Sequence, residues 1–145
     1  MKSVVFIGHD DCYGVNYDAL KEKIEECIKN GAKYFYSGGY GGFDRLTATL
    51  IYKFKDKYKD IKNYLIIPYQ KFTVFDKALF DEIVFPEILL NCHFKGAIVK
   101  RNRFMVDECD TAICFINHGW GNAVKTYEYA VRKKLNIINL GKHNI

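Results

Sequence analysis

The chain has 145 residues, a hydrophobic content of 49%, a charged content of 27% and a formal net charge of +5, which are ordinary values for one globular domain. No apolar run approaches the length of a transmembrane helix or of a secretory signal, so we expect a cytoplasmic protein without membrane contact. Only two prolines occur, Pro68 and Pro86, and without a proline-rich linker we expect residues 1–145 to form a single domain.

Apolar periodicity predicts short strands that alternate with helices. The first strand is Val4–Ile7, which ends at Gly8, and the first helix is Tyr17–Asn30, with Gly31 just past its end. The other predicted strands are Lys33–Tyr36, Lys62–Ile67, Thr111–Ile116 and Asn136–Leu140, and the other predicted helices are Asp44–Lys59, Gly96–Cys109 and Ala123–Lys134. This alternation is typical of βαβ units, and it predicts an α/β fold with a mostly parallel sheet.

Residues 69–95 have the least regular pattern. Phe75–Phe80 is consistent with a helical turn, and Glu82–Phe85 with a short strand that stops at Pro86. Aromatic residues make up 16% of the chain, more than one small core needs, so we expect a homo-oligomer, a dimer or larger. The stretch Phe72–Phe94 is our candidate interface.

Two glycine-rich turns are the most informative features. Ser37–Arg45 has four glycines in five positions between a predicted strand and a predicted helix, and Asn117–Asn122 is a second turn of the same kind. Glycine lets the backbone approach a ligand closely, and the free N–H groups of a helix N-terminus attract anions. These turns and the loop after Gly8 follow strand ends, where parallel sheets bind their ligands. The turns match neither common phosphate-binding motif. Their positions therefore indicate only that one anionic, nucleotide-like small molecule binds between them.

The candidate ligand-binding residues come from these loops, with one arginine from a predicted helix. They are Gly8, His9, Ser37, Gly38, Gly39, Gly41, Gly42, Phe43, Asp44, Arg45, Arg101, Asn117, Gly119, Trp120, Gly121 and Asn122.

Several of these residues allow two interpretations. Asp44 can cap the second helix or contact a ribose hydroxyl. Arg45 can bind a phosphate or form a structural ion pair. His9 can bond to nearby backbone or to the ligand, and Trp120 can stack on a base or pack at a subunit interface. Asn122 can cap the last helix, whose amides would face a phosphate in either case.

Arg101 and Arg103 point about 200° apart on a helix, so only one of them can face the pocket. The other positive residues are spread over several predicted helices. We interpret them as solvated faces, and we regard a nucleic-acid partner as the less favoured alternative. The five cysteines include no CxxC pair, so we expect reduced thiols, no metal and no cofactor.

Four motifs occur together in order: Phe6-Ile7-Gly8-His9, Gly41-Gly42-Phe43-Asp44-Arg45, Arg101–Asp107 and the last glycine turn. Through them essentially the whole chain resembles the SLOG superfamily, in its YpsA-like branch, which is related to the Lonely Guy phosphoribohydrolases. The resemblance implies a single Rossmann-like three-layer domain and a pocket for nucleotide-related ligands. Some members cleave the N-glycosidic bond of nucleoside monophosphates, and others bind or sense nucleotide-derived signals.

The sequence departs from the family pattern at two places. Asp10 follows His9 where the YpsA-like pattern has arginine, and Lys125 falls where the Lonely Guy motif PGGxGTxxE has its glutamate. Arg101 with Met105 keeps the spacing of the RKxxM motif, and Glu128 lies one helical turn beyond Lys125. Because the carboxylate is displaced, we expect binding or sensing of a nucleotide. The alternative is an N-glycosidase acting on nucleoside 5′-monophosphates, with Arg101 and Glu128 as the catalytic pair.

Overall fold

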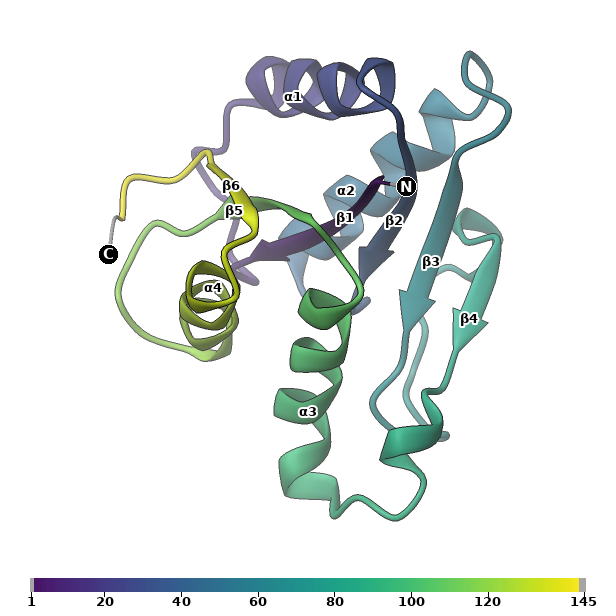
Figure 1. Cartoon of the computed structure of the whole chain (residues 1–145), viewed down its shortest axis with the longest axis vertical. Coiled ribbons are helices and arrows are strands. Elements are labelled where there is room, and N and C mark those ends of the chain that lie inside the picture. The colour runs from purple at the N-terminus through teal and green to yellow at the C-terminus, as the bar shows by residue number, and fades with distance from the viewer. Residues whose placement is uncertain (1, 144–145) are drawn as a thin grey trace.

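Six parallel strands form one sheet in the computed structural model, which describes residues 2–143 (Figure 1). The strands lie in the order β4-β3-β2-β1-β5-β6. Their bounds are β1 Lys2–Gly8, β2 Ala32–Ser37, β3 Lys62–Ile66, β4 Glu82–Val84, β5 Thr111–Phe115 and β6 Asn136–Asn139. The predicted α/β fold with a parallel sheet is confirmed.

Helices cover both faces of the sheet, because the central strand β1 is apolar on both sides. Val4 and Phe6 pack on one face with α1 (Tyr17–Lys29) and α2 (Gly42–Phe54). Val5 and Ile7 pack on the other face with α3 (Phe94–Asp107) and α4 (Asn122–Arg132). This is the three-layer arrangement of a Rossmann-like fold. No helix within residues 2–143 is long and apolar enough to cross a membrane.

The strand order reverses direction beside β1. From β1 the chain adds β2, β3 and β4 on one side, and it then returns to place β5 and β6 on the other side. In open parallel sheets such a reversal leaves a crevice at the carboxyl ends of the two strands. The loops that follow β1 and β5 therefore meet at one end of the sheet.

The predicted elements all occur, with shifted ends. The predicted helix Asp44–Lys59 runs from Gly42 to Phe54, because the chain then turns and the Tyr58 hydroxyl donates to Glu25 Oε2 of α1 at 2.7 Å. Within residues 69–95 the structure has two single-turn 3₁₀ helices, η1 (Lys77–Leu79) and η2 (Glu87–Leu89), on either side of the edge strand β4.

Candidate functional site

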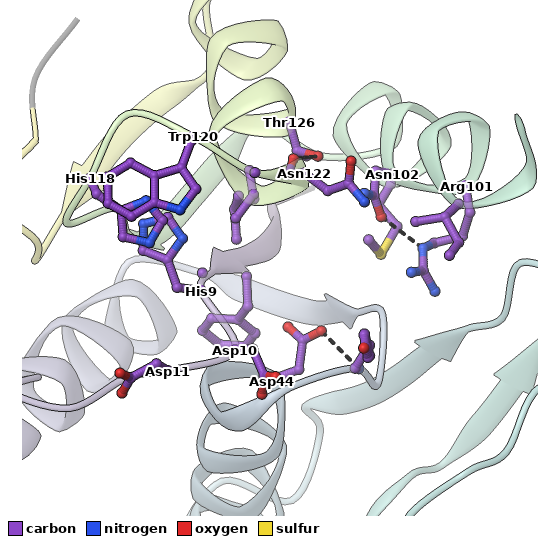
Figure 2. Close-up of a pocket in the computed structure, with 18 residues that line it drawn as sticks. His9, Asp10, Asp11, Asp44, Arg101, Asn102, His118, Trp120, Asn122 and Thr126 are labelled. Atoms are coloured by element: carbon purple, nitrogen blue, oxygen red, sulfur yellow. Dashed lines mark hydrogen bonds between the residues drawn. The ribbon is translucent and has the colours of Figure 1, made fainter. Parts of the chain in front are cut away.

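A pocket of about 340 Å³ lies where the strand order reverses (Figure 2). Four segments line it: Phe6–Asp11 at the end of β1 and just after it, Tyr40 with Asp44, one side of α3 (Ile98, Arg101, Asn102 and Met105), and the segment from His118 through Trp120–Ala123 to Thr126. Residues from β1, the first glycine turn, α3 and the second glycine turn are thus brought together. The pocket lies at the strand ends where the sequence predicted one shared site.

Three aromatic rings are stacked on one side of the pocket. The His9 and His118 rings lie 3.6 Å apart between centroids, at an interplanar angle of 16°. The His118 and Trp120 rings are also 3.6 Å apart, at 19°. Trp120 is 70% exposed, so the outermost ring of the stack is open to solvent and available to a flat ligand.

His9 is the buried end of this stack. Its Nε2 accepts a hydrogen bond from the Asn117 backbone N–H at 3.0 Å, so Nδ1 carries the proton of the neutral ring. Burial lowers the pKa of His9, and the neighbouring His118 and His143 lower it further. The ring is therefore neutral at pH 7, and it anchors the loop after β5 to the end of β1.

Arg101 is a buried cation at the opposite side of the pocket, only 3% exposed. Its Nη1 donates to the carbonyl oxygens of Gly38 at 2.9 Å and Ile66 at 2.7 Å, and its Nε donates to Asn102 Oδ1 at 2.8 Å. Burial lowers the pKa of Arg101 to about 10, against the opposing effect of Asp44. The side chain therefore stays charged at pH 7, although all of its hydrogen bonds within residues 2–143 go to uncharged oxygens.

Asp44 places a carboxyl group in the same pocket. Burial raises the pKa of Asp44 to about 6, while the hydrogen bond from the Tyr40 N–H and the charge of Arg101 oppose this shift. Asp44 Oδ2 accepts from the Tyr40 backbone N–H at 3.1 Å. The carboxyl group therefore titrates near neutral pH, which is the range that general acids and bases use.

Asp44 does not cap α2, contrary to one of the two predicted interpretations. The N-cap is Gly41, with φ of 94°, and it provides no side-chain bond. Instead the Gly42 N–H donates to Asp10, to the backbone oxygen at 2.8 Å and to Oδ1 at 3.1 Å. Asp10, which stands where the YpsA-like pattern has arginine, therefore places its own carboxylate at the N-terminus of α2.

The N-terminus of α4 is open by comparison. Its N-cap is Gly121, with φ of 101°, and no side chain caps the helix. The helix begins at Asn122, so Asn122 does not have the capping role that the sequence suggested. Asn122 and Ala123 line the pocket. The first amides of a helix are unsatisfied within the helix and carry a partial positive charge, so this end of the pocket favours an anion.

The glycines of the first turn pack beneath the residues that line the pocket and do not line it themselves. Ser37, Gly38 and Gly39 are buried, and none of them lines the pocket. A Cβ atom at Gly38 would lie 2.9 Å from Arg101 Cζ, so this glycine makes room for the arginine. Phe43 is fully buried in the core and packs against Gly8, and Gly41 and Gly42 pack against Asp10.

Other predicted residues lie outside the pocket. Arg45 is exposed and its Cζ lies 4.7 Å from the centre of the Phe75 ring. Asn117 Oδ1 accepts from the Lys142 backbone N–H at 3.1 Å, and Gly119 lies beside His143. These contacts support structural roles for Arg45, Asn117 and Gly119.

The proposed catalytic pair of Arg101 and Glu128 is not brought together. Arg101 lines the pocket, whereas Glu128 lines only an adjoining groove of about 160 Å³ formed by α3 and α4. Glu128 lies about one helical turn beyond Lys125 in α4, as predicted, but its side chain does not line the pocket. Asp44 is the half-buried carboxyl group that the pocket does contain.

Sequence reasoning did not select several residues that line the pocket: Asp10, Asp11, Tyr40, Ile98, Asn102, Met105, His118, Ala123 and Thr126. The available signal was that His118 lies in the loop that follows β5, as His9 begins the loop that follows β1.

Comparison with known proteins agrees with this architecture. A family model for YpsA, described as the YspA SLOG family, matches residues 4–77. The solved structure of the structural genomics target TM1055 is 14% identical, with a TM-score of 0.63 over 94% of this chain and 72% of that chain. The Helicobacter pylori DNA processing protein A, studied for its single-stranded DNA binding mode, is 15% identical, with a TM-score of 0.65 over 95% of this chain and 64% of that chain. These two likenesses show a shared fold. No curated protein matches the chain.

Proposed function

The chain belongs to the SLOG family represented by YpsA, and we propose that it binds or senses a nucleotide or nucleotide-derived small molecule. The ligand occupies the pocket between the carboxyl ends of β1 and β5. Its phosphate lies at the Arg101 side or at the N-terminus of α4, and its base lies on the ring stack.

The observation that carries this proposal is the state of Arg101. A buried guanidinium is costly unless an opposite charge accompanies it. Arg101 has only uncharged hydrogen-bond partners within residues 2–143. The Asp44 carboxyl group, with a pKa of about 6, is ionised at pH 7, but it forms no ion pair with Arg101 within 4.0 Å in the described residues. A phosphate or another anion in the pocket would give the guanidinium a directly bonded negative charge.

The other walls of the pocket suit the remaining parts of a nucleotide. The uncapped N-terminus of α4 supplies amide donors for phosphate oxygens. Trp120 presents a largely exposed indole next to the pocket, and stacking of a base on such a ring contributes about 1–3 kcal/mol. A volume of about 340 Å³ lies within the usual range of small-molecule sites.

Ligand binding is tested with a panel of nucleoside mono-, di- and triphosphates and dinucleotide derivatives, by thermal shift and by mass spectrometry of the bound fraction. We expect at least one nucleotide to raise the Tm and to be recovered intact. A panel without any shift, at ligand concentrations of several millimolar, would contradict the proposal.

Asp44 supports a second candidate function, the cleavage of nucleoside 5′-monophosphates at the N-glycosidic bond. A carboxyl group with a pKa of about 6, in the same pocket as a buried arginine, has the character of a general acid or base for glycosidic cleavage. Asp44 takes the place that sequence analysis gave to Glu128. Release of free base and ribose 5-phosphate, abolished in an Asp44→Asn variant, would establish this activity, and intact recovery of every nucleotide would exclude it.

A further inference from the structure

A second groove, lined by residues of α3 and α4, adjoins the ligand pocket. It has a volume of about 160 Å³, and Asn102, Asn122 and Thr126 line both the groove and the pocket. Figure 2 shows these three side chains together at the end of the pocket that is next to Arg101. A ligand that fills the pocket can therefore extend into the groove between these polar side chains.

Three cations face this groove: Arg103 from α3, and Lys125 and Arg132 from α4. Within residues 2–143 none of them has a carboxylate oxygen within 4.0 Å. Glu128 is the single acidic residue that lines the groove, so the lining carries an excess of positive charge.

Tyr129 holds the two arginines at the groove. Arg103 Cζ lies 5.1 Å from the centre of the Tyr129 ring, and Arg132 Cζ lies 5.8 Å from it. Cation–π contacts of this kind orient a guanidinium without neutralising it. The Tyr129 hydroxyl donates to Asp107 Oδ1 at 2.8 Å.

The nearby acidic group Asp107 is already engaged. It accepts from the Tyr129 hydroxyl and lies 3.7 Å from the Lys133 ammonium, so it balances a fourth cation. The charges of Arg103, Lys125 and Arg132 remain, and like charges that converge on one groove are stabilised by an anion between them.

We propose that this groove binds a second phosphate of the same ligand, so that the ligand is a dinucleotide or another nucleotide with two separated phosphates. This inference rests on the proposed function. Along α4, Lys125 lies three residues and Arg132 ten residues beyond Asn122, which corresponds to about 5 and about 15 Å from the N-terminus of the helix. A phosphate one nucleoside away from the first one falls within this interval.

The test compares three adenine ligands by isothermal titration calorimetry. AMP carries the first phosphate alone, ApA carries the internucleotide phosphate alone, and pApA carries both. We expect pApA to bind at least tenfold more tightly than AMP or ApA, with a steeper dependence on salt concentration. An Arg103→Glu, Arg132→Glu double variant should bind pApA at least tenfold more weakly and AMP within twofold of wild type.

Lys21→Glu is the matched control, because Lys21 is an exposed residue of α1 on the opposite face of the sheet. It should leave both affinities unchanged. AMP binding without any gain for pApA would overturn the second phosphate site and leave the proposed function standing. Equal weakening of AMP and pApA by the double variant would overturn it as well. Absence of binding by all three ligands would overturn the second phosphate site, while the nucleotide panel decides the proposed function.

Discussion

Arg101 and Gly38 are fitted to each other across 63 residues of chain. The Gly38 carbonyl accepts from Arg101 Nη1 at 2.9 Å, and a Cβ atom at residue 38 would lie 2.9 Å from Arg101 Cζ. Gly38 thus leaves the space that the Arg101 guanidinium fills. Arg101 Nη1 also donates to the Ile66 carbonyl, so the arginine links the end of β2 to the end of β3.

Gly38→Ala should therefore displace Arg101. We expect a loss of about 1–3 kcal/mol in the free energy of unfolding, as for other overpacked sites, together with at least tenfold weaker binding of a nucleotide. Urea denaturation and calorimetry measure the two effects. Gly96→Ala is the matched control: its Cβ would meet only Cys92 Sγ at 3.9 Å, so neither quantity should fall. Wild-type affinity in Gly38→Ala would contradict the role of Arg101.

Asp44→Asn should stabilise the protein at neutral pH. The folded state raises the pKa of Asp44 from 3.8 to about 6, so the folded protein binds the proton more tightly than the unfolded chain does. The cost of the buried carboxylate is present above pH 6 and disappears as the pH falls through 6 towards 4. Two pKa units set an upper bound of roughly 3 kcal/mol at pH 7.5, and an amide can still accept the Tyr40 hydrogen bond.

Urea denaturation at pH 7.5 and pH 4 measures this difference. The variant should be more stable at pH 7.5, with the gap closing at pH 4. The exposed Asp56→Asn variant controls for the loss of one negative charge. An equal difference in the free energy of unfolding between variant and wild type at both pH values would show that the ionised Asp44 carboxylate does not destabilise the folded protein.

His9 should make the fold less stable in mild acid. Its pKa is lowered in the folded state, so the unfolded chain takes up the proton first, and stability is lost as the pH falls below about 6.5. In His9→Gln the amide oxygen can replace Nε2 as the acceptor for the Asn117 N–H, and it does not titrate. The decrease in Tm between pH 7.5 and pH 5.5 should therefore be smaller in the variant. An equal decrease would assign the acid sensitivity to other groups.

The alternation of strands and helices was predictable because it depends on local periodicity. The place of the candidate pocket was also predictable, since loops at the carboxyl ends of neighbouring parallel strands lie at one end of the sheet. The roles within the site were not, because they depend on distant contacts. The placement of Arg101 depends on a hydrogen bond to the Gly38 carbonyl. The first amide of α2 is bonded by Asp10, which lies 32 residues earlier in the chain. The ring stack joins His9 to His118, more than 100 positions apart.

Trp120 should report ligand binding directly. It is the only tryptophan, and its ring is the outermost one of the stack, so a base stacked on it should quench the intrinsic fluorescence. Trp120→Ala should weaken nucleotide binding by about 1–3 kcal/mol. It should change the free energy of unfolding by less than about 1 kcal/mol, because the side chain is 70% exposed. Quenching without any loss of affinity in the variant would mean that the base lies elsewhere in the pocket.

Asp10 should oppose ligand binding while it supports the fold. Its carboxylate bonds the Gly42 N–H at the start of α2 and also lines the pocket, where it repels a phosphate. Asp10→Ala removes a helix cap, which costs about 1 kcal/mol, and the backbone bond from Gly42 to the Asp10 carbonyl limits the loss. The same change should tighten the binding of a nucleotide several-fold, with a smaller effect at high salt.

Asp10→Asn separates the two effects, since it keeps a capping oxygen and removes the charge. If Asp10→Asn and wild type bind equally well at low salt, the phosphate lies too far from Asp10 for this repulsion, and the N-terminus of α4 becomes the better place for it.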